Sequence, residues 1–188
     1  MDDPFIPDHE IIEFPAVFLN SETLQVDFEF HAFVRPTEEP LLSEFCTELT
    51  GIDQATVSES ETLECALLRF RSFLRQNRIE SFTVCSDGPW DFDKFLFPEC
   101  KRKHIEYPGW ARNWLDVRKR FAHQFELQKW VGVTDMLANF DLGFEGRLHS
   151  GIDDARNIAR IVKALHEKAG KKLRPNRKLA SSLKQKQK

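Results

Sequence analysis

Residues 10–34, EIIEFPAVFLNSETLQVDFEFHAFV, decide the fold of this chain. The run at 10–20 is rich in apolar and aromatic residues, as strands are. The run at 23–34 alternates, and its apolar face holds Leu24, Val26, Phe28 and Phe30. Its polar face holds Gln25, Asp27, Glu29 and His31, which is the pattern of a half-buried strand. Turn residues at 20–22 separate the two runs, so the stretch predicts a β-hairpin.

Helical spacing dominates the rest of the chain. Ser60 or Thr62 can cap a helix with one apolar face, and residues 81–86 form a short apolar run typical of a buried strand. Short helices are expected at 90–96 and at 134–140, the latter with Thr134 as a candidate cap. The clearest helix ends at Gly170, and its stripe consists of Ile152, Ala155, Ile158, Ala159, Val162, Leu165 and Ala169. These elements predict a mixed α/β protein built in layers.

The composition predicts one folded domain. The chain has 188 residues and 22.0 kDa, with 41% apolar and 30% charged residues, values that exclude a disordered or fibrous protein. No apolar run approaches the roughly 20 residues of a membrane helix, and no secretory signal is visible. The four cysteines form no C-x-x-C pair, which argues against zinc. We therefore expect an intracellular protein of the cytoplasm or nucleus, without membrane contact.

Charge is distributed unevenly along the chain. Residues 170–188 hold eight Lys or Arg residues and no acid, whereas the rest carries 19 basic and 30 acidic residues. We expect a domain at 1–169 and a basic, disordered tail at 170–188. The tail is either a phosphate-contacting or nuclear-import segment or a solvated end. Its candidate nucleic-acid-binding residues are Lys171, Lys172, Arg174, Arg177 and Lys178.

Three places hold candidate catalytic groups. Asp87 and Asp91 follow the predicted strand at 81–86, where open α/β sheets keep their sites, although this segment alone favours turn and cap roles for them. His149 precedes a helix whose first turn carries Asp153 and Asp154, and the helix dipole alone accounts for such acids. In a third place, Asp27 and Glu29 share a strand face, for which a solvated face is the simpler interpretation.

Five segments in register identify a family resemblance. They are EIIEFP at 10–15, VRP at 34–36, LTGI at 49–52, DGPWD at 87–91 and HSGIDDARNIA at 149–159. Together they resemble the DnaQ-like 3′–5′ exonucleases of the DEDDh type, in particular the Eri-type branch that trims histone mRNA, small RNAs and ribosomal RNA. The resemblance spans residues 9 to about 169. It implies a ribonuclease-H-like mixed sheet flanked by helices and hydrolysis of single-stranded RNA 3′ ends.

The resemblance also implies roles for individual residues. In the family, four carboxylates bind two Mg²⁺ ions, and a histidine takes the proton from the attacking water. Carried over by motif, Asp91 and Asp154 are metal ligands and His149 is the general base. Asp87 and Asp153 keep their roles in a turn and at a helix start.

One family feature is absent from this sequence. The first Asp-x-Glu motif and its strand precede the EIIEFP segment in the family, and here that segment begins at Glu10. Asp27 and Glu29 lie on the second hairpin strand and do not replace it. We therefore expect weak Mg²⁺ binding, unpaired backbone groups at the centre of the sheet, and a short isoform or a gene model started at an internal methionine.

Three functions follow as hypotheses. The first is a metal-dependent 3′–5′ exoribonuclease acting on single-stranded RNA 3′ ends, with ribonucleoprotein partners. The second is a non-catalytic RNA-binding or regulatory chain, because metal ligands are missing and the tail is basic. The third is a 3′–5′ exonuclease acting on DNA, because no residue can be assigned to recognition of a 2′-hydroxyl group.

Overall fold

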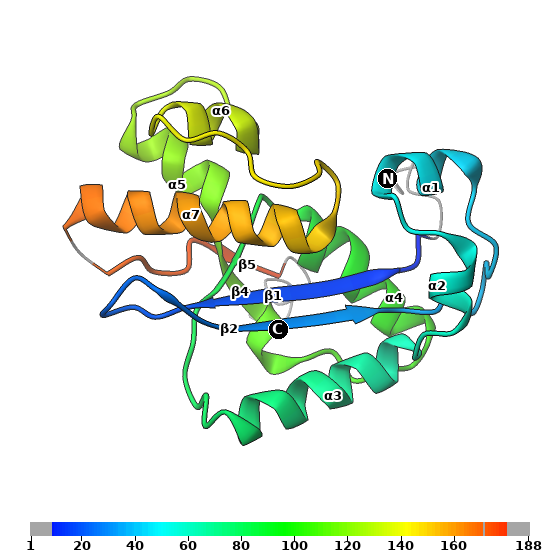
Figure 1. Ribbon diagram of the computed structural model, residues 1–188. Coiled ribbons are helices and arrows are strands. Elements are labelled where there is room, and N and C mark those ends of the chain that lie inside the picture. The colour runs from blue at the N-terminus through cyan, green and yellow to red at the C-terminus, as the bar shows by residue number, and fades with distance from the viewer. Residues whose placement is uncertain (1–8, 171, 180–188) are drawn as a thin grey trace, which may run out of the picture.

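The computed structural model describes residues 9–170 and 172–179 as strands and helices arranged in layers (Figure 1). In chain order the elements are β1 (Glu13–Leu19), β2 (Val26–Phe33), α1 (Glu44–Thr50), α2 (Gln54–Ser58), α3 (Leu63–Gln76), β3 (Val84–Ser86), η1 (Trp90–Leu96), α4 (Phe97–Arg102), η2 (Gly109–Arg112), β4 (Asn113–Asp116), α5 (Val117–Gln124), α6 (Val133–Ala138), α7 (Gly151–Ala169) and β5 (Arg177–Lys178). Within the described residues, no helix is long and apolar enough to cross a membrane.

The predicted hairpin is confirmed and lies between two helices. β1 and β2 pair antiparallel, with α7 over one face and α3 over the other (Figure 1). Phe30 is buried on the α3 side, whereas Phe28, nearer the turn, is 38% exposed. The polar face is not simply solvated, because Glu29 accepts a 2.7 Å hydrogen bond from Arg156 of α7. Helix α7 therefore packs against the polar face of the hairpin.

The strands form two separate sheets rather than one. β3 pairs parallel with β4, and β4 pairs antiparallel with β5, while β1 and β2 stand apart from them among the described residues. The mixed α/β class is confirmed.

Local signals predicted the helices that correspond to α3, η1, α6 and α7, whereas α1, α2, α4, η2 and α5 were not predicted. Thr62 caps α3 by accepting a hydrogen bond from the backbone N–H of Cys65, as its hydroxyl allows. The short helix expected at 90–96 is confirmed as a π-helix, and it continues directly into α4. Thr134 is not a cap, because α6 begins one residue earlier and Gly132 occupies that position.

The C-terminal segment corrects the expectation of a disordered tail from residue 170. β5 adds to the edge of β4, and the side chain of Leu179 is fully buried. Asn176 accepts a 2.8 Å hydrogen bond from the backbone N–H of Asp116 and donates one of 3.0 Å to its carbonyl. These long-range contacts bind residues 172–179 to the fold. Residues 171 and 180–188 lie outside the described residues.

Candidate active site

Asp87 lies directly after β3 and is held by a cation. Its two carboxylate oxygens accept hydrogen bonds of 2.5 and 2.6 Å from Nε and Nη2 of Arg118 on α5. Such a bidentate pair fixes the guanidinium and carboxylate planes relative to each other and occupies both carboxylate oxygens. Asp87 therefore joins the end of β3 to α5, in agreement with its predicted structural role. Arg118 itself was not predicted from the sequence.

Asp91 is the second residue of η1 and one of the predicted metal ligands. Protein atoms packed around its carboxyl group raise its pKa to about 6, and the charges of Asp87 and Asp154 add to the effect. The residue nevertheless keeps a side exposed to solvent. Asp91 and Asp154, separated by 63 positions in the sequence, are thus brought close enough to repel each other.

The start of α7 carries the other two predicted residues. Burial raises the pKa of Asp154, while the charge and backbone N–H of His149 act in the opposite direction. His149 is exposed and has a positive φ of 67°, a conformation that is uncommon outside glycine. The structure therefore places His149 beside Asp154, and Asp154 within the electrostatic reach of Asp91.

Glu13 is a part of the site that the sequence did not assign. Its carboxylate accepts hydrogen bonds from the backbone N–H groups of Gly151 (2.8 Å) and Ile152 (3.0 Å), at the start of α7. His31 lies 2.8 Å from the same carboxylate. A negative charge at a helix N-terminus is favoured by the helix dipole. The only sequence signal was the position of Glu13 within the EIIEFP segment.

The loop that carries His149 is anchored by two side chains of α7. Asp153 accepts a 2.9 Å hydrogen bond from the backbone N–H of Arg147. Asn157 is fully buried and bonds both the backbone N–H (3.1 Å) and the carbonyl (2.7 Å) of Glu145. These contacts hold residues 145–149 against the helix, and they give Asp153 the structural role predicted for it.

The donor set suits a divalent cation only in part. Two neighbouring carboxylates with raised pKa values are the groups that a bound hard cation would stabilise as anions. Across residues 9–170 and 172–179, however, no three His, Cys, Asp or Glu side chains come close enough together to hold a metal ion. The described residues thus offer two carboxylate ligands rather than a closed metal site.

The predicted tail cations have different surroundings. Lys172 and Arg174 line a cavity together with Lys119, Arg120 and His123 of α5, which the sequence did not indicate. Arg177 pairs with the buried carboxylate of Asp116 and lies over the ring of Trp130. Lys178 is exposed on β5, and Lys171 lies outside the described residues.

Comparison with known proteins shows which family the chain resembles. The exonuclease family (RNase_T) matches residues 1–162. The 3′-5′ exoribonuclease 1 of Rattus norvegicus is 36% identical over 176 residues, covering 91% of this chain and 50% of the relative. The 3′-5′ exonuclease Snipper of Drosophila melanogaster is 38% identical over 168 residues, covering 81% of this chain and 59% of the relative. The chain therefore spans about half the length of the curated relatives it matches.

Solved structures share the fold. A full-length 3′-exonuclease superposes with a TM-score of 0.88 at 34% identity, covering 95% of this chain and 60% of the other. The nuclease domain of 3′hExo, a DEDDh family member bound to rAMP, gives 0.85 at 34% identity, covering 92% of this chain and 88% of that domain. A third structure, of a 3′-exonuclease recognising the histone mRNA stem-loop, gives 0.86 at 34% identity, covering 94% and 80%.

Proposed function

Because the chain belongs to the exonuclease family RNase_T, we propose that it is a divalent-metal-dependent exonuclease that removes nucleotides from the 3′ ends of single-stranded RNA. The observation that supports this proposal is the meeting of Asp91, Asp154 and His149 at the start of α7. Among the proteins named above, one is called an exoribonuclease, one recognises the histone mRNA stem-loop and one is bound to rAMP.

Each residue has a proposed role set by its chemistry. Asp91 and Asp154 bind the cation, for which Mg²⁺ is the proposed ion, through oxygen atoms that the fold holds in a partly desolvated position. A bound divalent cation polarises a phosphoryl oxygen and lowers the pKa of a bound water. His149, exposed beside Asp154, is the proposed base that takes the proton from the attacking water.

The test is a trimming assay on RNA labelled at its 5′ end. With Mg²⁺, the chain is expected to produce a ladder of products shortened from the 3′ end. Asp91→Asn, Asp154→Asn and His149→Gln should each abolish the ladder. Asp135→Asn is the matched control, because Asp135 is an exposed carboxylate on α6 and has no proposed role in the chemistry. Trimming that survives all three site variants refutes the proposal.

A non-catalytic RNA-binding role is the second candidate. It is favoured by the absence of a three-ligand cluster among the described residues and by the basic cavity beside α5. Salt-dependent binding of RNA without any trimming in Mg²⁺ or Mn²⁺ would select this role. Matched RNA and DNA oligonucleotides in the same assay separate ribonuclease from deoxyribonuclease activity.

The proposal also covers the partners of the chain, its location in the cell and the extent of its folded unit. Ribonucleoprotein partners would supply the choice of RNA, since the five recognised motifs all belong to the nuclease. An intracellular location suits a chain whose four cysteines are free thiols. We extend the folded exonuclease unit beyond residue 169 to include residues 172–179, because Leu179 is buried in it.

A further inference from the structure

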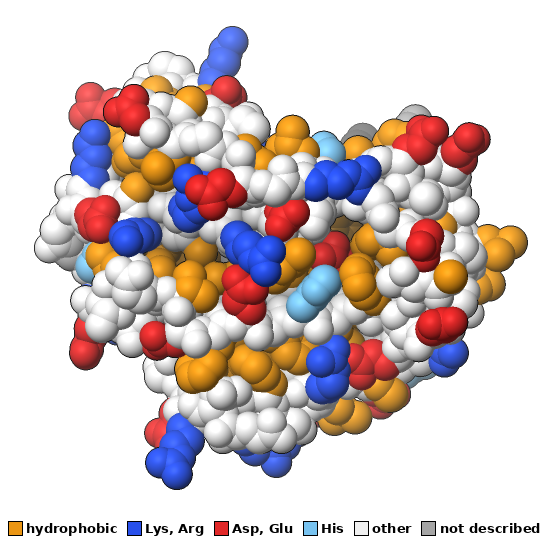
Figure 2. Space-filling view, viewed as in Figure 1, with side chains coloured by type: hydrophobic (Ala, Val, Ile, Leu, Met, Phe, Trp, Pro, Cys, Tyr) orange, Lys and Arg blue, Asp and Glu red, His pale blue; other side chains and the backbone are white. Residues whose placement is uncertain are grey.

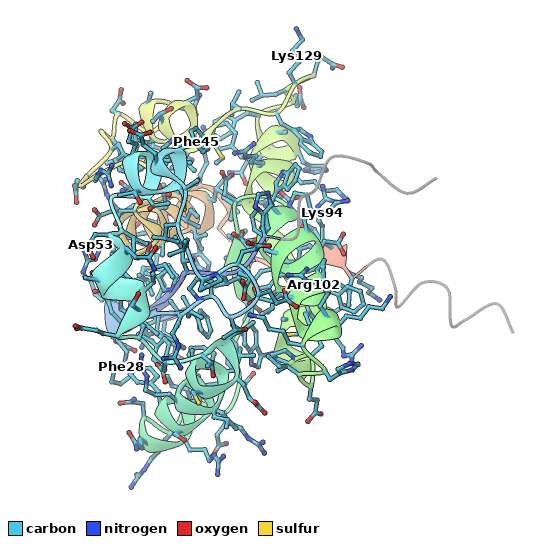
Figure 3. The ribbon with its side chains drawn as sticks, turned by 90° about the vertical axis from the view of Figure 1, so that its right-hand side faces the viewer. Phe28, Phe45, Asp53, Lys94, Arg102 and Lys129 are labelled. Carbon is cyan, nitrogen blue, oxygen red and sulfur yellow. The ribbon has the colours of Figure 1, made fainter. Side chains whose placement is uncertain are left out.

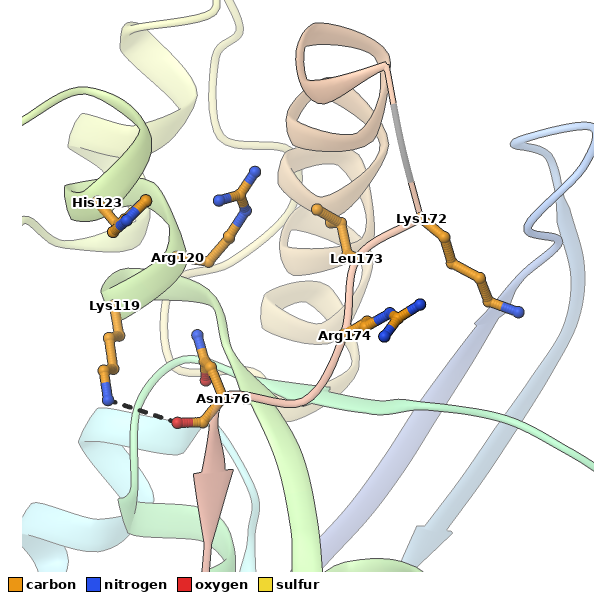
Figure 4. A pocket seen from close by; sticks show the side chains of 7 residues that line it. All are labelled: Lys119, Arg120, His123, Lys172, Leu173, Arg174 and Asn176. Carbon is orange, nitrogen blue, oxygen red and sulfur yellow. Dashed lines mark hydrogen bonds between the residues drawn. The ribbon is translucent and has the colours of Figure 1, made fainter.

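Five basic or titratable side chains surround an open cavity on α5. The cavity has a volume of about 550 Å³ and is lined by Lys119, Arg120, His123, Lys172, Leu173, Arg174 and Asn176 (Figure 4). Four of the seven are Lys or Arg, and no acid is among them. The face formed by α7 and the hairpin differs, because there basic and acidic side chains are interspersed (Figure 2).

The cations of this cavity are not neutralised by the part of the chain that the structure describes. Among the described residues, no carboxylate forms an ion pair with Lys119, Lys172 or Arg174. The ammonium group of Lys119 donates to the backbone carbonyl of Asn176, at 3.4 Å. Arg120 donates from Nη2 to Gln124, and its buried Nε finds no partner in the described part of the chain. Gathering unpaired cations costs electrostatic energy, which a bound anion would relieve.

The cavity is built by the fold and is not a chance gathering of flexible side chains. Asn176 bonds the backbone of Asp116 from both ends of its amide, and β5 pairs with β4. The segment at 172–176 is thereby held beside α5. Arg177 next to it is already paired with Asp116, so it strengthens the frame instead of adding a free charge.

The cavity lies on the same helix as a residue of the candidate active site. Arg118 bonds Asp87, and its neighbour Lys119 lines the cavity, about 100° further around the helix. A volume of about 550 Å³ exceeds what one phosphate group fills and leaves room for a sugar-phosphate unit. The cavity therefore has room for part of a phosphodiester strand.

We propose that this cavity binds backbone phosphates of the RNA strand at a position separate from the 3′ end being cut. The proposal rests on the proposed function for the identity of the strand. Lys119 and Lys172 contact phosphate oxygens from opposite sides of the cavity, and Arg120 and Arg174 add further donors. Phosphate contacts of this kind position a strand without reading its sequence.

The first experiment measures binding alone. The full chain is titrated against labelled single-stranded RNA in EDTA, over a series of salt concentrations. Each phosphate contact to a single strand contributes about 0.7 to the salt slope, so Lys119→Gln with Lys172→Gln should lower the slope by about 1.4 and weaken binding about 25-fold near 0.1 M salt. Replacing both lysines by arginine should retain binding.

The control variant removes the same charge elsewhere. Lys101 and Lys129 are both exposed, and Lys129 projects from the loop before α6, away from the body (Figure 3). Lys101→Gln with Lys129→Gln should leave the affinity within about twofold, because only non-specific attraction is lost. If both double variants weaken RNA binding equally, the attraction is diffuse and the proposal is overturned. It is also overturned if the double variant Lys119→Gln with Lys172→Gln binds RNA with the wild-type affinity.

Two further readouts separate the remaining outcomes. The double variant Lys119→Gln with Lys172→Gln is called the cavity pair. Suppose that inorganic phosphate stabilises the wild-type chain but not the cavity pair, and that both bind RNA with the same affinity. This result would indicate a site for a free anion and refute a site for RNA. In the trimming assay, the cavity pair should raise KM and leave kcat unchanged, since its lysines lie outside the reacting groups. Binding without trimming rejects the proposed function and keeps the cavity site. Trimming with an unchanged KM rejects the cavity site and keeps the function.

Discussion

The carboxylate of Glu13 accepts a 2.8 Å hydrogen bond from the backbone N–H of Gly151, across 138 positions of sequence. Its second oxygen bonds the next N–H of α7, so β1 supplies the cap that Ser150 does not provide with its own side chain. This contact fixes where α7 begins. It therefore also fixes where Asp154 and His149 lie relative to the hairpin.

Removing the charge of Glu13 should weaken this junction. Glu13→Gln is expected to lower the free energy of unfolding by about 1–2 kcal/mol, because a neutral amide presents one acceptor to a helix N-terminus that favours an anion. Urea denaturation measures the change. Glu22→Gln, in the exposed hairpin turn, is the control and should change stability by less than about 0.5 kcal/mol. A similar loss in both variants would contradict the capping role.

Asp91 should lower the stability of the folded chain at neutral pH. Its pKa is raised to about 6 from 3.8, so folding favours the protonated form, and stability is lost as the pH rises through that interval. Asp91→Asn should therefore be more stable than wild type at pH 7, by about 1 kcal/mol after allowance for solvent screening. The gain should vanish near pH 4. Thermal melts at both pH values, without metal, provide the test.

Glu10 should show the opposite pH dependence. Burial raises its pKa, but the backbone N–H groups of residues 37–39 and the ammonium of Lys103 outweigh this and lower the pKa to about 2. The stabilisation is complete above pH 4.5 and is lost as the pH falls toward 2. Glu10→Gln should cost up to about 3 kcal/mol at pH 7.

The check on Glu10 is a pair of urea titrations at pH 7 and near pH 2.5. The difference between wild type and Glu10→Gln should shrink at the lower pH. Glu39→Gln, whose side chain is exposed, should match wild type at both values. A difference that is independent of pH would show that packing, rather than charge, accounts for the loss.

Leu179 tests the placement of the end of the folded unit. Its side chain is fully buried, so Leu179→Ala should cost about 2–5 kcal/mol. The exposed Leu148 offers a matched substitution, for which Leu148→Ala should change stability by less than about 0.5 kcal/mol. Denaturant titration compares the two. A neutral Leu179→Ala would return the boundary to residue 169.

Local patterns predicted the parts of the fold that local forces determine. The hairpin follows from the alternation in 23–34, and α7 follows from a regular apolar stripe that ends at a left-handed Gly170. The ordered structure of the C-terminal segment was not predicted, because its high content of Lys and Arg indicated disorder and two structural residues were overlooked. Asn176 and Leu179 act through Asp116 and the core, contacts about 60 positions away that periodicity does not reveal.

The candidate site likewise contains residues that motifs predicted and residues that only distant contacts reveal. Asp91, His149 and Asp154 were found through motifs, and the structure places them near one another. Glu13 and Arg118 act only through distant partners, the start of α7 and Asp87, so no local signal marked them. The cavity cations of α5 were missed for a related reason, since Lys119 and Arg120 become a cluster only when the C-terminal segment lies beside them.

The most direct test of the central claim is the product ladder of a 5′-labelled single-stranded RNA incubated with this chain and Mg²⁺. The account predicts products that shorten one nucleotide at a time from the 3′ end, that disappear in EDTA, and that are absent with Asp154→Asn. RNA that stays intact with the wild-type chain, or an identical ladder from wild type and Asp154→Asn, would contradict it.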